Sequence, residues 1–87
     1  MTRNKKLCVI GGGGVRTPFV AKTVATRAAS SGIAELILFD TDKFKLEKIG
    51  SISKEIASRI DSELKVTLQN DAHLALKDCD FIITTVR

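Results

Sequence analysis

Four consecutive glycines, Gly11 to Gly14, stand between an apolar run and the pair Thr17-Pro18. Glycine lacks a Cβ atom, so its backbone can adopt a positive φ and can approach a ligand closely. The first amide groups of a helix have no partner inside the helix and carry the positive end of its dipole. A buried strand, a glycine turn and a helix start, in that order, therefore predict a phosphate site that suits the pyrophosphate of a dinucleotide.

The spacing of the glycines matches part of a dinucleotide fingerprint. Gly11 and Gly13 occupy the first two positions of the pattern G-x-G-x-x-G, and Arg16 holds the third. The phosphate loop of ATPases needs Lys and then Ser or Thr after its glycines, whereas this chain has Arg16-Thr17-Pro18, so ATP hydrolysis is not expected. The Arg16 side chain has two interpretations: it is solvated on the first helical turn, or it approaches the pyrophosphate or an anionic substrate.

A carboxylate stands where a dinucleotide would present its adenosine ribose. Asp40 lies 29 residues after Gly11, at the end of the second predicted strand. An acid at this place can accept hydrogen bonds from ribose hydroxyls, and it would repel a 2′-phosphate, which favours NAD(H) over NADP(H). The alternative is that Asp40 only begins a turn or caps the next helix, a role that Asp42 could also take.

Catalytic and metal-binding groups are not evident in this chain. His73, the single histidine, is expected to be solvated or to cap a short surface helix. No His, Cys and carboxylate residues have metal-ligand spacing, and no Ser-His-Asp arrangement emerges. Cys8 and Cys79 lack the tight spacing of a zinc site or a disulfide framework. We expect both to be buried as small hydrophobic residues in a reducing cytosol, which predicts a cytoplasmic protein.

The elements that must position these residues alternate along the chain. Strands are predicted at 6–10, 35–39, 64–68 and 81–86, and helices at 18–31, 43–60 and 72–76. Thr17 is a good N-cap for the first helix, and Gly32 is a natural residue to end it. This β-α-β-α-β-α-β order predicts an α/β fold, the N-terminal half of a Rossmann-like doubly wound parallel sheet with strand order 3-2-1-4.

The apolar pattern also predicts which faces are buried. The third strand alternates apolar and polar residues, which is typical of an edge strand, and the fourth is apolar on both faces at its start. Gly50, inside the second helix, is expected to mark close packing on the sheet. The predicted helix faces are Phe19, Val20, Thr23, Val24 and Ala28 in the first helix, and Leu46, Ile49, Ile52 or Ser53, Ile56 and Ile60 in the second.

Length and composition set the class of protein. The chain has 87 residues, 44% of them hydrophobic, which suffices for one small domain with an aliphatic core. Its net charge of +4 arises from basic residues interleaved with acids, so a nucleic-acid surface is not predicted. No apolar stretch reaches the length of a signal-peptide core or a membrane span. Because Arg87 directly follows the fourth strand, we expect residues 1–87 to be a partial dinucleotide-binding domain of a longer enzyme; the alternative is a half-fold that pairs with a second copy.

Three segments together resemble a known family. The segment 10–18, Ile-Gly-Gly-Gly-Gly-Val-Arg-Thr-Pro, resembles the opening of glycoside hydrolase family 4, typically Ile-Gly-Gly-Gly-Ser-x-aromatic-Thr-Pro. The Thr17-Pro18 pair is its most specific part, while Gly14 replaces the usual Ser and Arg16 the usual aromatic residue. The segments 35–40 and 80–87 look like the second and fourth strands of that family, and the 6-phospho-β-glucosidase branch is the most similar.

The resemblance implies an unusual hydrolase. Such enzymes use bound NAD to oxidise a phosphorylated sugar at C3, eliminate the aglycone, add water and reduce the ketone again, with a divalent metal, usually Mn²⁺. The family's metal-binding Cys and His and its tyrosine base lie downstream of Arg87, and this chain has no Tyr, so the chain alone is expected to be inactive. The substrate would be a phosphorylated disaccharide or glycoside, and the parent a homo-oligomer.

The candidate site residues follow from the loop, the acid and the resemblance together. Two other functions stay open at this point: the NAD-binding half of a malate- or lactate-type dehydrogenase, and a non-catalytic nucleotide-sensing regulatory module. Arg87 is a candidate for binding the substrate. The candidate cofactor-binding residues are Gly11, Gly12, Gly13, Gly14, Val15, Arg16, Asp40 and Thr85.

Overall fold

Strands and helices alternate along the chain as the sequence predicts. The computed structural model describes residues 3–85. All strand pairs are parallel, and the order across the sheet is β3-β2-β1-β4, which confirms the predicted half of a doubly wound sheet. The elements are β1 (Lys5–Ile10), α1 (Thr17–Ser31), β2 (Ile33–Phe39), α2 (Lys43–Ile60), β3 (Lys65–Gln69), α3 (Ala72–Leu76) and β4 (Phe81–Thr84).

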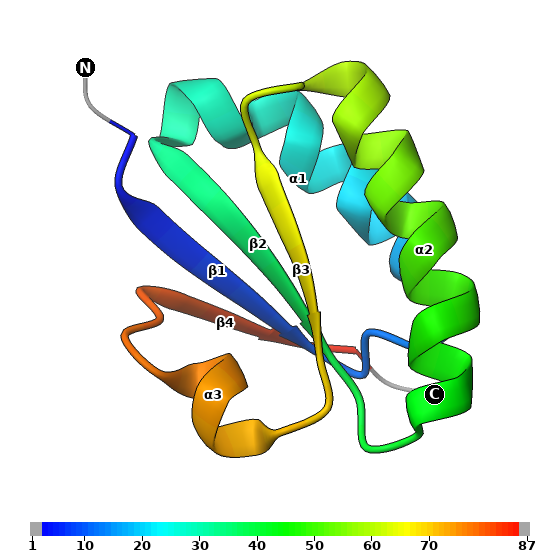
Figure 1. Cartoon of the computed structure of the whole chain (residues 1–87). Helices are drawn as coiled ribbons and strands as arrows, with labels where there is room; N and C mark the ends of the chain where they lie inside the picture. Colours follow the sequence, from blue (N-terminus) through cyan, green and yellow to red (C-terminus); the bar gives the residue numbers. More distant parts are fainter. Residues whose placement is uncertain (1–2, 86–87) are drawn as a thin grey trace.

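The sheet separates two unequal apolar layers. Helices α1 and α2 cover one face and the short α3 covers part of the other (Figure 1). The larger cluster joins α1 and α2 to the sheet and includes Val9, Leu36 and Leu38, all fully buried or nearly so. The smaller cluster, under α3, is built on Cys8, Ile37 and Ala75. Within residues 3–85, no helix combines the length and apolar character needed to cross a membrane.

Helix α1 starts one residue earlier than predicted. Its N-cap position is Arg16, which makes no side-chain capping bond, so the prediction that Thr17 is the N-cap is wrong. Thr17 is instead fully buried, and its hydroxyl donates to the Gly11 carbonyl oxygen at 3.2 Å. The helix ends as predicted at Gly32, whose φ of 75° places it in the left-handed region that favours glycine.

The buried faces of the helices are rotated from those predicted. In α1, Val24 and Ala28 are buried as expected, but Phe19 is 72% exposed and Thr23 is also exposed. The actual face contains Ala21 and Ala25. Small side chains suit this face because α1 packs on both the sheet and α2, and a phenylalanine there would hold the layers apart.

Helix α2 has the predicted bounds and a similar rotation. Of the alternatives Ile52 and Ser53, the buried residue is Ser53, while Ile52 is 47% exposed; Ile60 is 43% exposed, so placing it in the buried stripe is wrong. The buried positions are Leu46, Gly50, Ser53 and Ala57. A Cβ atom on Gly50 would lie 2.7 Å from Leu68 Cδ2, which confirms that this glycine permits close packing on the sheet.

The two edge strands differ from each other. Among the described residues, β3 pairs with β2 alone and has the half-covered pattern expected of an edge. Within residues 3–85, β4 pairs with β1 alone, and all four of its residues are exposed although the start of the strand is apolar on both faces. The physical reason is that α3 packs on β2 and β3, which leaves β4 uncovered. The predicted last residue of this strand, Val86, lies outside the described residues.

Candidate functional site

The glycine loop folds back on the end of β2. The amides of Gly11 and Gly12 both donate to the Phe39 carbonyl oxygen, at 2.9 and 2.7 Å. The Gly14 amide donates to the Gly11 carbonyl oxygen at 2.9 Å. These three donors are therefore used to shape the loop. Close approach explains the glycines: a Cβ atom on Gly12 would lie 2.9 Å from the backbone of Leu38.

Asp40 lies against this loop and is only 2% exposed. Its Oδ2 accepts a hydrogen bond from the Gly13 amide at 2.9 Å, and its Oδ1 accepts one from the Asp42 amide at 2.9 Å. Asp40 thus makes the turn predicted as one of its two alternatives. Asp42 is the N-cap of α2, because its side chain accepts from the Lys45 amide at 3.1 Å.

Open donors lie at the far end of the loop. Among residues 3–85, no acceptor pairs with the main-chain amides of Val15 and Arg16. Both side chains are exposed, Val15 by 87%. The two amides directly precede α1, where the positive end of the helix dipole adds to their attraction for an anion. They are the donors that remain for a phosphate.

Thr85 closes the loop from the end of β4. Its hydroxyl lies within hydrogen-bonding distance of the carbonyl oxygens of Ile10 and Gly11, at 3.0 and 3.2 Å. Gly11 has a φ of 94°, and a Cβ atom there would collide with the Thr85 hydroxyl. The predicted candidate Thr85 is therefore at the loop, whereas Arg87 lies outside the described residues.

Two cavities meet at Thr85. One, of about 260 Å³, lies at the ends of β1 and β2. The other, of about 660 Å³, lies between the starts of α1 and α2, and none of the described residues that line it is acidic. The smaller cavity is lined by Ile10, Gly11, Phe39, Asp40, Thr41 and Thr85. The larger is lined by Gly13, Gly14, Val15, Arg16, Phe44, Lys45, Lys48, Ile49 and Thr85.

Sequence reasoning missed the contribution of α2 to this site. Lys45 and Lys48 join Arg16 as cations around the larger cavity, and Phe44 lines it although its side chain is 73% exposed. The sequence held a signal: α2 begins three residues after Asp40, and residues three apart on a helix lie on the same face. The first turn of this helix must therefore stand beside the glycine loop.

A family comparison decides the identity of this fold. The model of family 4 glycosyl hydrolases matches residues 6–87. The chain belongs to glycosyl hydrolase family 4. The family resemblance seen in the glycine loop and in the second and fourth strands is thereby confirmed.

Relatives of this family 4 chain are phosphoglucosidases. A probable 6-phospho-beta-glucosidase from Bacillus subtilis (strain 168) is 32% identical over the whole chain. A solved 6-phospho-alpha-glucosidase from gut microorganisms, in complex with NAD and Mn²⁺, is 31% identical over 97% of the chain with a TM-score of 0.86. The 6-phospho-beta glucosidase from Thermotoga maritima, with NAD and glucose-6-phosphate, is 26% identical over 98% of the chain with a TM-score of 0.85. The chain spans about a fifth of the length of each, 20%, 19% and 20% respectively.

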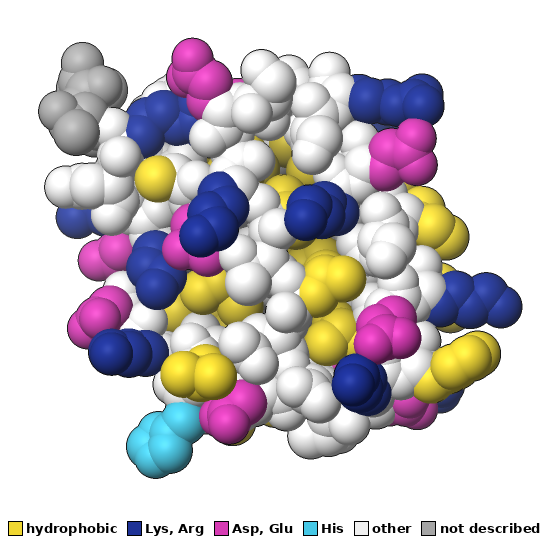
Figure 2. Space-filling model, in the orientation of Figure 1, with side chains coloured by type: hydrophobic (Ala, Val, Ile, Leu, Met, Phe, Trp, Pro, Cys, Tyr) yellow, Lys and Arg dark blue, Asp and Glu magenta, His cyan; other side chains and the backbone are white. Residues whose placement is uncertain are grey.

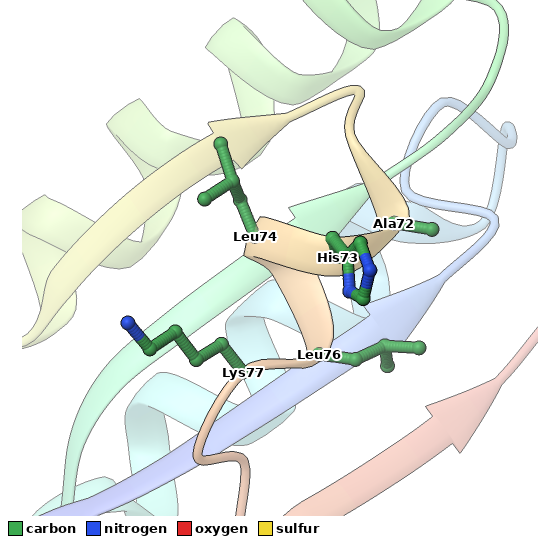
Figure 3. Close-up of a pocket in the computed structure, with 5 residues that line it drawn as sticks. All are labelled: Ala72, His73, Leu74, Leu76 and Lys77. Carbon is green, nitrogen blue, oxygen red and sulfur yellow. The ribbon is translucent and has the colours of Figure 1, made fainter.

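Other features of the family 4 chain lie away from this site. A cavity of about 750 Å³ lies over α3, lined by Ala72, His73, Leu74, Leu76 and Lys77 (Figure 3). His73 is exposed, as expected, and Asp71 rather than His73 caps the helix. In the part of the chain that the structure describes, no three His, Cys, Asp or Glu side chains are grouped to hold a metal ion.

The prediction that both cysteines are buried holds for one of them. Cys8 is fully buried, whereas Cys79 is half-buried and packs against the same small cluster. Burial, together with the neighbouring Cys79, raises the pKa of the Cys8 thiol to about 11. Cys8 therefore stays protonated at neutral pH and behaves as a small hydrophobic residue. The face seen in Figure 2 intersperses Lys and Arg with Asp and Glu and shows no continuous basic stripe.

Proposed function

We propose that residues 1–87 form the dinucleotide-binding segment of an NAD- and divalent-metal-dependent 6-phospho-glycosidase, and specifically of a 6-phospho-β-glucosidase. The substrate class is a phosphorylated disaccharide or glycoside. Bound NAD would supply hydride transfer at C3 of the sugar, which makes elimination of the aglycone and final re-reduction possible. Family membership and the NAD complexes of the relatives support this proposal.

The observation that carries the proposal is the pair of open amides at the start of α1. The Val15 and Arg16 amides have no acceptor among residues 3–85 and lie beside a cavity with three cationic side chains. A pyrophosphate carries two negative charges and many acceptor oxygens. Amide donors, a helix N-terminus and nearby cations all favour such a group. We assign its binding to these two amides with Arg16, Lys45 and Lys48.

Asp40 is proposed to hold the adenosine ribose. Its carboxylate lines the smaller cavity together with Gly11 and Thr41, at the end of β2, where an acid can hydrogen-bond the hydroxyls of a ribose. The negative charge of Asp40 would oppose a 2′-phosphate and so favours NAD over NADP.

The remaining groups of the reaction are proposed to lie outside this chain. The described residues offer no cluster for a metal, and the chain has no tyrosine. We therefore propose that the Mn²⁺ ligands and the catalytic base belong to a longer parent protein, and that this chain alone is inactive. We also propose that Arg87 lies near the substrate, and that the parent is cytoplasmic and homo-oligomeric.

Two measurements test this function. Isothermal titration of the chain with NAD⁺ should give saturable binding that NADP⁺ does not match. The intact gene product should hydrolyse a 6-phospho-β-glucoside when NAD⁺, Mn²⁺ and a thiol reductant are present, with no net accumulation of NADH. Accumulation of NADH with a 2-hydroxy acid, and no hydrolysis of any glycoside, would instead support a dehydrogenase.

A further inference from the structure

We propose that Thr17 is a positioning residue for the phosphate-binding loop: its buried hydroxyl, together with that of Thr85, holds the Gly11 carbonyl so that the Val15 and Arg16 amides face the ligand. This inference rests on the proposed function for the identity of the ligand. The positioning itself depends only on contacts inside the chain.

The Gly11 carbonyl oxygen is the point on which the loop closes. It accepts from the Gly14 amide at 2.9 Å. The hydroxyls of Thr17 and Thr85 approach the same oxygen, each at 3.2 Å. A carbonyl oxygen has two lone pairs, and the Gly14 amide and the Thr17 hydroxyl are enough to use both. Rotation of this peptide would break the contacts to the start of α1 and to the end of β4 as well as the local turn.

Thr17 contributes more to this arrangement than its hydroxyl. Its own amide donates to the Gly14 carbonyl oxygen at 3.0 Å. Two bonds therefore run back from Thr17 to the loop, one to Gly11 and one to Gly14. They enclose the short segment that carries the Val15 and Arg16 amides, so the direction of these amides is set before a ligand arrives. The next residue is Pro18, which has no amide hydrogen to compete for the ligand.

The hydroxyls of Thr17 and Thr85 differ in the number of carbonyl oxygens that they approach. The Thr85 hydroxyl is shared between the oxygens of Ile10 and Gly11. In the described chain the Thr17 hydroxyl has Gly11 as its one acceptor, and Thr17 is fully buried. Loss of the Thr17 hydroxyl is therefore expected to have the larger effect on the loop.

The test compares Thr17→Val, which removes the hydroxyl and keeps the shape, with Thr17→Ser, which keeps the hydroxyl. Thr26→Val is the matched control, because Thr26 is an exposed threonine of α1 that donates to the Lys22 carbonyl at 2.8 Å. Loss of one hydrogen bond predicts that Thr17→Val weakens NAD⁺ binding by about three- to tenfold. Thr17→Ser and Thr26→Val should bind NAD⁺ as tightly as the unsubstituted chain.

Amide hydrogen exchange measured without nucleotide tests the positioning role of Thr17 independently of the proposed NAD-binding function. The Gly14 amide should exchange faster in Thr17→Val than in the unsubstituted chain, in Thr17→Ser or in Thr26→Val. If no protein binds NAD⁺ but this exchange pattern holds, the proposed function is wrong and the positioning role is supported. Thr85→Val acts on the same carbonyl from a half-buried position. Unchanged Gly14 exchange in both folded variants, or in Thr85→Val alone should Thr17→Val not fold, would overturn the inference.

Discussion

The Asp40 carboxylate accepts a hydrogen bond from the Gly13 amide, at 2.9 Å, in the interior of the protein. It also accepts one from the Asp42 amide, and it thereby links the glycine loop to the start of α2. Asp40, which we expect to bind ribose, is therefore in direct contact with the loop that we expect to bind pyrophosphate. Asp40 therefore also stabilises the loop itself, and a substitution there must be tested for its effects on both stability and nucleotide binding.

Replacing Asp40 should therefore change stability and nucleotide preference together. In Asp40→Asn one carboxylate oxygen becomes an amide nitrogen that cannot accept the Gly13 or Asp42 hydrogen bond. A buried amide left without its acceptor costs about 1–3 kcal/mol of unfolding free energy, to be measured by urea denaturation. Titrations with NAD⁺ and NADP⁺ should show the preference for NAD⁺ reduced.

Asp71→Asn is the control for this prediction, because Asp71 caps the exposed helix α3 and asparagine is also a good cap. It should alter neither property. An Asp40 variant that is destabilised but keeps its nucleotide preference would leave Asp40 as a structural residue and would remove its ribose role.

The cations of α2 should matter for binding and not for folding. Lys45→Ala and Lys48→Ala each remove a charge beside the larger cavity, so each should weaken NAD⁺ binding by about three- to fivefold at low salt, and less at high salt as screening grows. Lys43→Ala is the matched control: this lysine is exposed on the same helix and does not line the cavity. Equal effects of all three variants would indicate a general influence of net charge.

The topology of this chain was predictable because its signals are local. Runs of aliphatic residues separated by helix-length segments specify a parallel sheet, and Gly32 and Asp42 mark helix ends by their own conformational preferences. The position of Asp40 at the loop also followed from strand order alone.

The predictions that were wrong concern features that depend on tertiary packing. Thr17 was expected to cap a helix by its residue type, but the loop carbonyl competes for its hydroxyl. Phe19 and Ile52 are apolar yet exposed, because close helix contacts select alanine and glycine in their place. Lys45 and Lys48 enter the site because α2 packs beside the loop, so their role depends on the position of Asp40 before this helix as well as on their own spacing.

The glycines of the loop should differ sharply in their tolerance of a side chain. A Cβ atom on Gly12 would lie 2.9 Å from the backbone atoms of Leu38 and Phe39, which cannot move aside without disturbing β2. Overpacking of this kind costs about 1–3 kcal/mol, so Gly12→Ala should lower the melting temperature clearly. At Gly14 the nearest atom is the Gly11 oxygen at 3.2 Å, and Gly14→Ala should cost less than Gly12→Ala. Similar melting temperatures for the two variants would contradict the loop geometry described above.

The ion pair between Arg3 and Asp61 should give the chain an acid-sensitive part of its stability. Arg3 Nη2 lies 2.7 Å from Asp61 Oδ2, and both side chains are largely covered, with 17% and 14% exposed. The hydrogen bond from Arg3 holds the pKa of Asp61 below its ordinary value of 3.8. Because the pKa is depressed in the folded state, the stabilisation is complete above about pH 4 and is lost as the pH falls through the folded-state pKa.

Arg3→Ala should therefore reduce the unfolding free energy by about 1 kcal/mol at pH 7, and it should flatten the decline in stability below pH 4. The control is Arg59→Ala, since Arg59 pairs with Glu55 on the surface of α2 with 78% and 65% of the side chains exposed. That exposed pair should contribute about 0.3–0.5 kcal/mol or less. Urea denaturation from pH 3 to pH 7 measures both. If the curve for Arg3→Ala runs parallel to that of the parent chain down to pH 3, the low pKa of Asp61 does not arise from Arg3.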